Sequence, residues 1–442
     1  MARHGRAARP ALLMLPECDG RRPHDGRTLA VVTSPDVDAA PPQTPPRPLP
    51  GGLVLREGRP QDLDQIADLL VRRGEEADAL DHRLVVDDPD AGWESCAVVV
   101  DGDRVVSTAT LLDETLRTGG VDLPAGQVEL VATDTAYEGR GLVRALMGWA
   151  HERSAARGHV VQVMIGIPYF YRLFGYEYAI DIPQPRTVTP APDGVPAGTF
   201  RRARRDDLPA LTAMHDAVQR GVDVAMPHSP PRRRWVLAHE GSATWVVERD
   251  GVPVATARTQ PPDGYLLAAE VAAVDEDAAR ALLGHLAGLV PGGDLRVVDR
   301  PGIVAPATTA NERDAEQYYV RIPDEGALLD RLRPVLSERL RACGLDRSGG
   351  ELVISTFGRH HRMAIGDGGL GAPVTGGTMQ SPYAAGGMAV APDHLGALLF
   401  GPLGVIGLAA RRPDVYPGAD RELYAAVFPP LTADLLTYYL PW

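Results

Sequence analysis

An internal repeat constrains the fold of this 442-residue chain more than any other feature of its sequence. The stretch Arg56-Glu-Gly-Arg-Pro-Gln-Asp-Leu aligns with Arg201-Arg-Ala-Arg-Arg-Asp-Asp-Leu, and an aliphatic residue follows both at helical spacing. Further on, the turn at Asp101-Gly and the strand after it align with Asp250-Gly and its strand. A repeat of about 145 residues predicts a duplicated domain.

The two copies differ in a loop between a strand and a helix. In the first copy the strand through Thr133 is followed by Gly139-Arg-Gly-Leu-Val-Arg, which opens a helix. The matching stretch of the second copy, from Val271 onward, lacks both glycines and is shorter. Because a glycine loop at a helix N-terminus presents free N–H groups to an anion, only the first copy is expected to bind a phosphate-bearing ligand.

The length predicts several domains, because single cores stop growing at about 250 to 300 residues. We expect a disordered Pro/Arg-rich extension over 1–50, copy one over 51–190, copy two over 191–325 and a third domain of helices and strands over 326–442. In the third domain, Pro334 interrupts a leucine-rich helical stretch and is expected to start a second helix or kink the first.

Composition excludes several classes of function. All 45 basic residues are arginine, so mechanisms that need a lysine amine, such as Schiff-base chemistry or a Walker A loop, are excluded. The three cysteines have no metal-site spacing, which predicts no metal site and a reducing, cytoplasmic location. No apolar run is long enough to predict a membrane-spanning helix. The net charge of -13 disfavours nucleic acid and favours cationic or neutral partners.

A second motif follows the glycine loop by about thirty residues: Gly166-Ile-Pro-Tyr-Phe-Tyr-Arg-Leu-Phe-Gly-Tyr. Together the two motifs resemble the acetyl-coenzyme A loop and the tyrosine motif of GNAT acetyltransferases. With a degenerate second copy and a third domain, the chain resembles the enhanced intracellular survival (Eis) type. The resemblance implies an α+β (α/β) fold of tandem GNAT domains, the first active and the second degenerate, a sterol-carrier-protein-like C-terminal domain and a homohexamer. One departure is Ala136, where the family usually has Gln or Arg.

The resemblance also implies the residues of the site, with acetyl-CoA as co-substrate. The expected contacts are Val131, Ala132 and Thr133 to the pantetheine arm, Gly139, Arg140, Gly141, Leu142, Val143 and Arg144 to the pyrophosphate, and Gly166 and Ile167 beside the thioester. Tyr171 is the implied general acid, since a phenol of pKa near 10 can donate a proton to the leaving thiolate. The implied base is the terminal carboxylate of Trp442. The rival base is Glu129, which strand alternation places on one face with Val131 and Thr133.

The sequence therefore predicts an N-acetyltransferase that transfers acetyl directly to a primary amine of a small cationic acceptor of aminoglycoside or polyamine type. A peptide or protein amine is the alternative acceptor within the same chemistry. The alternative from another class is a non-catalytic protein that binds CoA or a lipid.

Overall fold

The computed structural model describes residues 45–88, 91–183, 185–188, 198–262, 264–298, 300, 308–309, 316–345 and 347–437. Most of the predicted extension, and the predicted base Trp442, lie outside the described residues. Within the predicted extension, strand β1 (Arg47–Pro48) pairs with β2 (Val54–Glu57), so ordered structure begins before residue 51.

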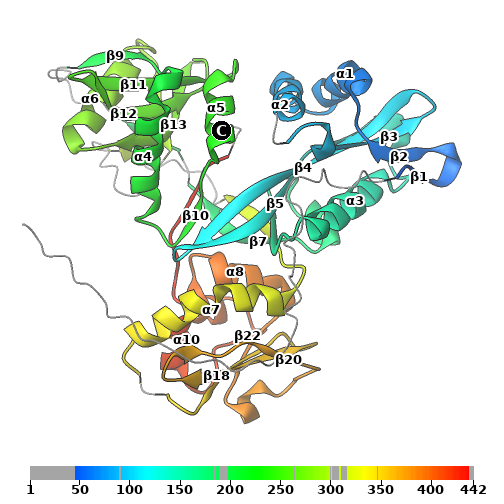
Figure 1. The fold of residues 1–442 in the computed structure, drawn as a ribbon, viewed down its shortest axis with the longest axis vertical. Helices are drawn as coiled ribbons and strands as arrows, with labels where there is room; N and C mark the ends of the chain where they lie inside the picture. Colours follow the sequence, from blue (N-terminus) through cyan, green and yellow to red (C-terminus); the bar gives the residue numbers. More distant parts are fainter. Residues whose placement is uncertain are drawn as a thin grey trace, which may run out of the picture. The chain divides into compact units, whose positions relative to one another are not determined.

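The first sheet is formed mainly by copy one, and its strands pair in the order β1-β2-β3-β4-β5-β6-β16-β7. The bounds of the other strands are β3 Cys96–Asp101, β4 Arg104–Thr118, β5 Val121–Thr133, β6 Val161–Met164, β16 Glu316–Arg321 and β7 Glu177–Ile182. Helices α1 (Leu63–Arg73) and α2 (Glu76–Asp87) cover one face of the sheet, and α3 (Leu142–Ala156) covers the other (Figure 1). The predicted order of strand, glycine loop and helix is confirmed by β5, residues 134–141 and α3.

The second sheet is formed mainly by copy two, in the order β15-β8-β14-β13-β12-β11-β9. Its strands are β15 Thr308–Thr309, β8 Pro185–Val188, β14 Asp294–Val298, β13 Tyr265–Ala273, β12 Val252–Thr259, β11 Ala243–Arg249 and β9 Thr199–Arg202. Copy two also contains helices α4 (Leu208–Gln219), α5 (Pro230–Ala238) and α6 (Glu276–Ala287).

The aligned residues of the repeat make the same contacts in both copies. Arg56 donates two hydrogen bonds to Asp62, of 2.7 and 2.9 Å. Arg201 donates two to Asp207 with the same two lengths. In each copy this pair joins the first strand to the start of the first helix, which explains why Arg and Asp recur at one spacing in the sequence.

The two sheets exchange strands. Strand β8 follows copy one's β7 in the chain but pairs with β14 of the second sheet. Conversely, β16 follows copy two yet pairs between β6 and β7 of the first sheet. The predicted limits at 190 and 325 therefore do not separate the strands of the two sheets, and the domain limits themselves stay predictions.

The third part of the chain has its own sheet, in the order β19-β18-β17-β21-β22 with β20 on β18. Its strands are β17 Glu351–Ser355, β18 His360–Gly366, β19 Gly369–Leu370, β20 Val374–Gly376, β21 Met388–Val390 and β22 Val415–Tyr416. Its helices are α7 Glu325–Ala342, α8 Leu395–Phe400, α9 Gly404–Ala409 and α10 Arg421–Val427. Pro334 lies inside the single helix α7, so no second helix starts there, and the alternative of a kink stays a prediction.

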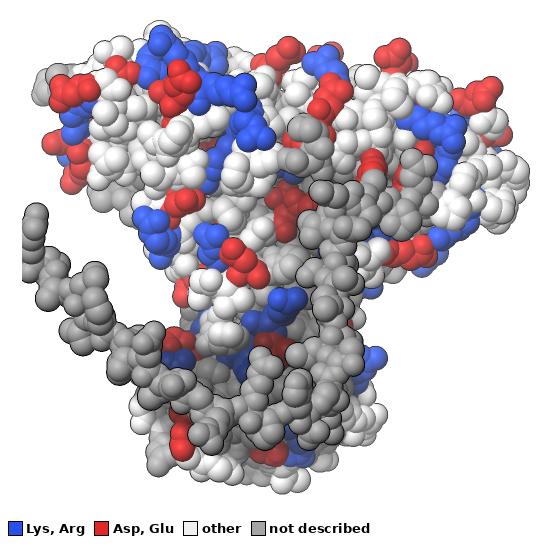
Figure 2. Space-filling view, in the orientation of Figure 1, with Lys and Arg blue, Asp and Glu red and all other residues white. Residues whose placement is uncertain are grey.

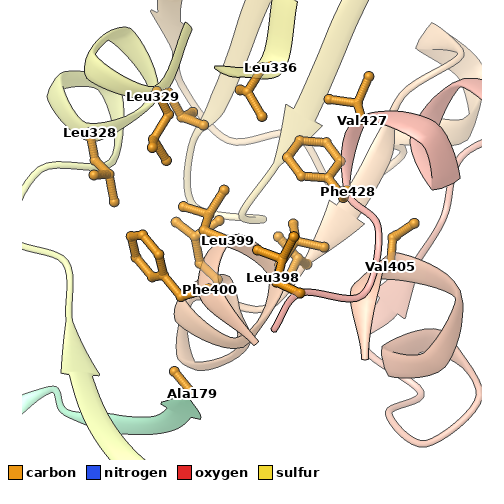
Figure 3. Close-up of a cluster of buried hydrophobic side chains, with 14 of the residues drawn as sticks. Ala179, Leu328, Leu329, Leu336, Leu398, Leu399, Phe400, Val405, Val427 and Phe428 are labelled. Atoms are coloured by element: carbon orange, nitrogen blue, oxygen red, sulfur yellow. The ribbon is translucent and has the colours of Figure 1, made fainter. Parts of the chain in front are cut away.

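Buried side chains of α7, α8 and the segment around Phe428 form one core, which continues to Ala179 of the first sheet (Figure 3). Two further strands complete the first sheet: β10 (Val224–Met226) pairs with β4 and, in parallel, with the last described strand, β23 (Ala433–Leu435). None of the described helices is long and apolar enough to cross a membrane.

Candidate active site

A β-bulge lies in β5 where the site was predicted. Thr108 of β4 pairs with Ala132 and Thr110 pairs with Glu129, so two residues of β5 oppose one residue of β4. Leu130 in the bulge has a positive φ of 53°, which non-glycine residues seldom adopt. Because partners of Thr108 and Thr110 share a face, Glu129 lies on the face of Ala132. The expectation that it shares a face with Thr133 is wrong, since the extra residue shifts the alternation.

Strands β5 and β6 separate just before the bulge. They pair in parallel only over Ala125–Gln127 and Val161–Val163. A cavity of about 360 Å³ lies where they diverge. It brings together the predicted residues Val131, Ala132, Gly166, Ile167 and Tyr171, together with Glu129. Among the described strands none pairs with the β6-facing edge of β5 after Gln127, so backbone groups there can bond a ligand.

The predicted phosphate loop lies at the start of α3 and does not line this cavity. Gly139 and Gly141 have φ values of 73° and 78°, in the left-handed region that favours glycine. Gly141 is the N-cap, so the first N–H groups of the helix, from Leu142 onward, have no partner within it. The local backbone therefore fits an anion, as the sequence predicted.

Two arginines flank the loop. The guanidinium of Arg140 lies over the ring of Tyr137, 4.6 Å from its centroid, and donates a hydrogen bond to the backbone oxygen of Ala136 at 3.3 Å. Arg144 lies 5.5 Å from the centroid of the Phe174 ring. Arg140 thus lies against Ala136, the position where the acetyltransferases that the sequence resembles usually have Gln or Arg.

Tyr171 is held in a short 3₁₀ helix, Phe170–Phe174, and is 5% exposed. Its ring packs directly on Gly166: a Cβ atom added there would lie 2.2 Å from Cε2 of Tyr171. Burial, and then the negative charge of Glu129, raise the pKa of Tyr171 above its ordinary value. The hydroxyl therefore keeps its proton at neutral pH, as a proton donor requires.

Glu129 would have to accept a proton, and its environment suits that role. Its Oε1 accepts a hydrogen bond of 2.7 Å from Nε2 of Gln127. Burial raises the pKa of Glu129 to about 8, with smaller contributions from the charges of Asp81 and Asp78. A carboxylate with a pKa near 8 can accept a proton from an ammonium group at neutral to mildly basic pH.

The far wall of the cavity was not predicted from the sequence. Helix α2 contributes Asp78 and Asp81, and copy two contributes His239 and Arg258. Nε2 of His239 lies 2.7 Å from Oδ1 of Asp81. No local motif marks these residues, because the wall is formed by segments far apart in the chain.

Copy two has the same bulge, but different side chains surround it. Thr256 pairs with Ala272 and Arg258 with Ala269, and the bulge residue Glu270 has a φ of 53°. Burial would raise the pKa of Glu270, but the charges of Arg258 and His228 hold it well below its usual range. Only Val274 and Asp275 separate β13 from α6, so the predicted lack of the glycine loop is confirmed.

A family model described as an acetyltransferase (GNAT) domain matches residues 55–179. No curated protein matches the chain in sequence. The chain therefore carries a GNAT acetyltransferase domain over residues 55–179, which include the bulge, the loop and Tyr171. This domain is that of an acyltransferase.

Solved structures resemble nearly the whole chain. A GCN5-related N-acetyltransferase from Kribbella flavida is 19% identical, with a TM-score of 0.63, over 88% of this chain and 100% of that one. One from Anabaena variabilis is 12% identical, with a TM-score of 0.64, over 85% and 96%. Eis1 from Mycobacterium abscessus is 17% identical, with a TM-score of 0.54, over 85% and 97%. At these identities the likeness shows the fold, which is mixed α/β as predicted.

Proposed function

We propose that the protein is an acetyl-CoA-dependent N-acetyltransferase that transfers acetyl directly to a primary amine of a small cationic acceptor, of aminoglycoside or polyamine type. The observation that carries this proposal is the cavity between β5 and β6. It holds one group suited to accept a proton, Glu129, and one suited to donate a proton, Tyr171, beside an edge of β5 with which no described strand pairs.

The residues for the co-substrate fit it chemically. The edge of β5 from Val131 to Thr133, with which no described strand pairs, can bond the amides of the pantetheine arm. The loop Gly139–Arg144 can bond the pyrophosphate through backbone N–H groups. Gly166 and Ile167 flank the thioester position. When bound, acetyl-CoA supplies the activated acetyl group.

In the proposed reaction, Glu129 takes a proton from the acceptor ammonium, and the free amine attacks the thioester carbonyl carbon. A C–N bond forms, the C–S bond breaks, and the departing sulfur receives the proton of the Tyr171 hydroxyl. The enzyme needs no nucleophile of its own, which agrees with a chain that has no lysine.

The acidic wall supports a cationic acceptor. Four carboxyl groups line the cavity, those of Glu75, Asp78, Asp81 and Glu129, against the two guanidinium groups of Arg73 and Arg258. An ammonium group near the carboxylates is favoured electrostatically. On the face drawn in Figure 2, arginine side chains gather in one area at the upper left, and the two signs are interspersed elsewhere. The acceptor preference is therefore attributed to the cavity and not to that surface.

The test is thiol release from acetyl-CoA with a panel of amines: polyamines, aminoglycosides, simple monoamines and a peptide with a free amine. Turnover with polycations and little with monoamines is the expected result, whereas preference for the peptide would favour the protein-amine alternative. No turnover and no thermal shift with acetyl-CoA would refute the enzyme proposal. A thermal shift without turnover would favour a non-catalytic CoA-binding protein.

A separate test concerns the base. By the family resemblance the carboxylate of Trp442 takes this role, and Glu129 is the rival that the described cavity contains. Appending a few residues after Trp442 is expected to abolish activity if the carboxylate takes part. Full activity of the extended chain would assign the base to Glu129 or to water.

The same resemblance supports a homohexamer and a sterol-carrier-protein-like third domain. Light scattering of the purified protein checks the first proposal, since a monomer or dimer at micromolar concentration would contradict it. A lipid-binding assay with the full chain checks whether the third domain holds a lipid.

A further inference from the structure

Arg300 occupies the position in copy two that corresponds to the ligand edge of copy one. Its side chain is buried, and Nη1 donates a hydrogen bond of 2.9 Å to the backbone oxygen of Val271. Val271 directly follows the bulge residue Glu270, as Val131 directly follows Leu130 in copy one. The strand carbonyl that corresponds to a proposed pantetheine contact is thus bonded by a guanidinium of the protein itself.

The same guanidinium anchors the last described strand. Nε and Nη2 of Arg300 donate to Oδ1 and Oδ2 of Asp434, each at 2.7 Å. Both side chains are nearly inaccessible to solvent, at 2% and 3% exposure. Because the pair is bidentate and buried, it fixes Asp434 and therefore β23 in one place.

Strand β23 in turn supports the segment that leads to His239 in the far wall of the cavity. It pairs in parallel with β10, and Nε2 of Gln219 lies 3.3 Å from the backbone oxygens of both Met226 and Asp434. Figure 1 shows β10 with the red strand β23 beside it. The chain continues from β10 to His228, which lies 3.3 Å from Glu270, and then through α5 to His239 at the cavity.

We propose that Arg300 is a positioning residue for the reaction. It bonds the strand edge of copy two that corresponds to the proposed ligand edge of copy one, and it anchors β23 there. Because β23 holds β10 and α5, this anchor keeps His239 beside Asp81 in the far wall of the cavity. This inference rests on the proposed function for its catalytic readout. It assigns to the degenerate copy a role in acceptor binding, at a distance from the bonds that form and break.

The experiment uses the full chain with Arg300→Ala and Asp434→Asn. The control variant is Arg249→Ala, which removes an arginine from an exposed ion pair with Asp275 in the same copy. Steady-state kinetics give separate KM values for the amine and for acetyl-CoA. Hydrogen–deuterium exchange of the peptides that contain β10, β23 and α5 gives a structural readout that needs no turnover.

We expect Arg300→Ala to raise the KM for the amine at least about tenfold, because small displacements of remote groups have large kinetic effects. The KM for acetyl-CoA should stay within about twofold, since its proposed contacts all lie in copy one. Exchange in β10, β23 and α5 should increase. Asp434→Asn keeps the shape of the side chain and should give a smaller change of the same kind, and Arg249→Ala should give none.

Faster exchange in β10 and β23 with an unchanged KM for the amine would overturn the inference, because the anchor would then be only structural. Unchanged exchange would overturn it as well. If Arg300→Ala does not fold, the same two criteria apply to Asp434→Asn. A wild-type protein without turnover on any amine would instead refute the proposed function, while the exchange data would still show whether Arg300 holds β23.

Discussion

The two copies have the same backbone at the critical strand and different chemistry around it. In both copies the bulge contains a residue with φ of 53° and shifts the strand register in the same way. In both, an Arg–Asp pair of the same geometry joins a strand, β2 or β9, to the start of the helix after it. Copy one leaves a cavity beside the bulge, whereas copy two fills the corresponding edge with Arg300. The backbone alone therefore does not make the site.

The glutamates at the two bulges show the same point. Glu129 precedes the bulge of copy one and is hydrogen-bonded by neutral groups, the side chain of Gln127 and the backbone of Ile165, so burial raises its pKa to about 8. Glu270 is the bulge residue of copy two, and Arg258 and His228 keep it ionised. Neighbouring cations decide whether a buried carboxylate can act as a base near neutral pH or serves as a fixed charge.

The largest expected effect tests Tyr171, the proposed proton donor of copy one. Tyr171→Phe should lower kcat on the order of 10³-fold, because general-acid assistance to the departing thiolate is lost. The Kd for acetyl-CoA should not change, since the ring still packs on Gly166. Tyr169→Phe is the control, as that neighbouring side chain is 68% exposed. An unchanged kcat in Tyr171→Phe would remove the tyrosine from the mechanism.

The second prediction concerns Glu129 as the base. Glu129→Gln should lower kcat on the order of 10²-fold, since water can take over part of the proton transfer. Because the deprotonated form is the active one, the wild-type rate should rise as pH increases through about 8. The variant should lose this rise. A pH–rate profile with the same midpoint in Glu129→Gln would assign the titration to another group.

The third prediction contrasts the stabilities of the two glutamate variants. The pKa of Glu129 is raised in the fold, so its contribution to stability is present below the unfolded pKa and is lost as pH rises toward about 8. Glu129→Gln should therefore flatten the fall of Tm between these two pKa values. The pKa of Glu270 is lowered, so its contribution is present above the unfolded pKa and is lost as pH falls.

Glu270→Gln should accordingly destabilise the protein at pH 7 by about 3–5 kcal/mol, because it removes the buried carboxylate that lies 3.4 Å from the guanidinium of Arg258. Thermal unfolding from about pH 3 to 9 measures both variants, since the contribution of Glu270 changes at acidic pH and that of Glu129 changes up to about pH 8. Equal pH dependence of Tm in the two variants would show that the environments of the glutamates do not differ as described.

The sequence predicted the parts of the site that depend on local order. The repeat, the strand, the glycine loop and the helix were all read from spacing, and Gly166 and Tyr171 do come together in the cavity. The face of Glu129 was predicted wrongly, because a bulge with a non-glycine residue, Leu130, at positive φ leaves no signature in a strand-like sequence.

Contacts between distant segments were also missed. Nothing near Asp81 in the sequence indicates that His239 lies against it, and nothing marks Arg300 as the partner of Asp434. The exchange of β8 and β16 was missed for a similar reason: a short strand has the same sequence pattern whichever sheet it joins. Such pairings are set by tertiary packing and not by local propensity.

The fourth prediction tests the loop that only copy one has. Gly141→Ala places a side chain at φ of 78°, which costs about 1–2 kcal/mol and disturbs the N-terminus of α3. The Kd for acetyl-CoA should rise about tenfold, measured by calorimetry, as this energy corresponds to roughly that factor. The control is Gly251→Ala, at φ of 81° in a hairpin turn of copy two. An equal loss of affinity in both variants would show a general effect of strain.

The smallest effect on activity is expected where the copies are most alike. Arg56→Ala leaves the buried Asp62 without its bidentate partner and should lower the free energy of unfolding by about 1–3 kcal/mol. Arg201→Ala should lower it more, because Arg201 also donates to Glu248 at 2.8 Å and its loss leaves two carboxylates together. Urea denaturation measures both losses.

Neither arginine variant should change either KM by more than about twofold, since both pairs lie outside the cavity lining. A selective loss of acetyl-CoA affinity in Arg56→Ala would mean that this pair supports the ligand edge of β5 in copy one. In that case the Arg–Asp pair would be part of what distinguishes the copies, although its geometry is the same in each. Matched losses of stability with unchanged kinetics would instead restrict the difference between the copies to the bulge, the loop and Arg300.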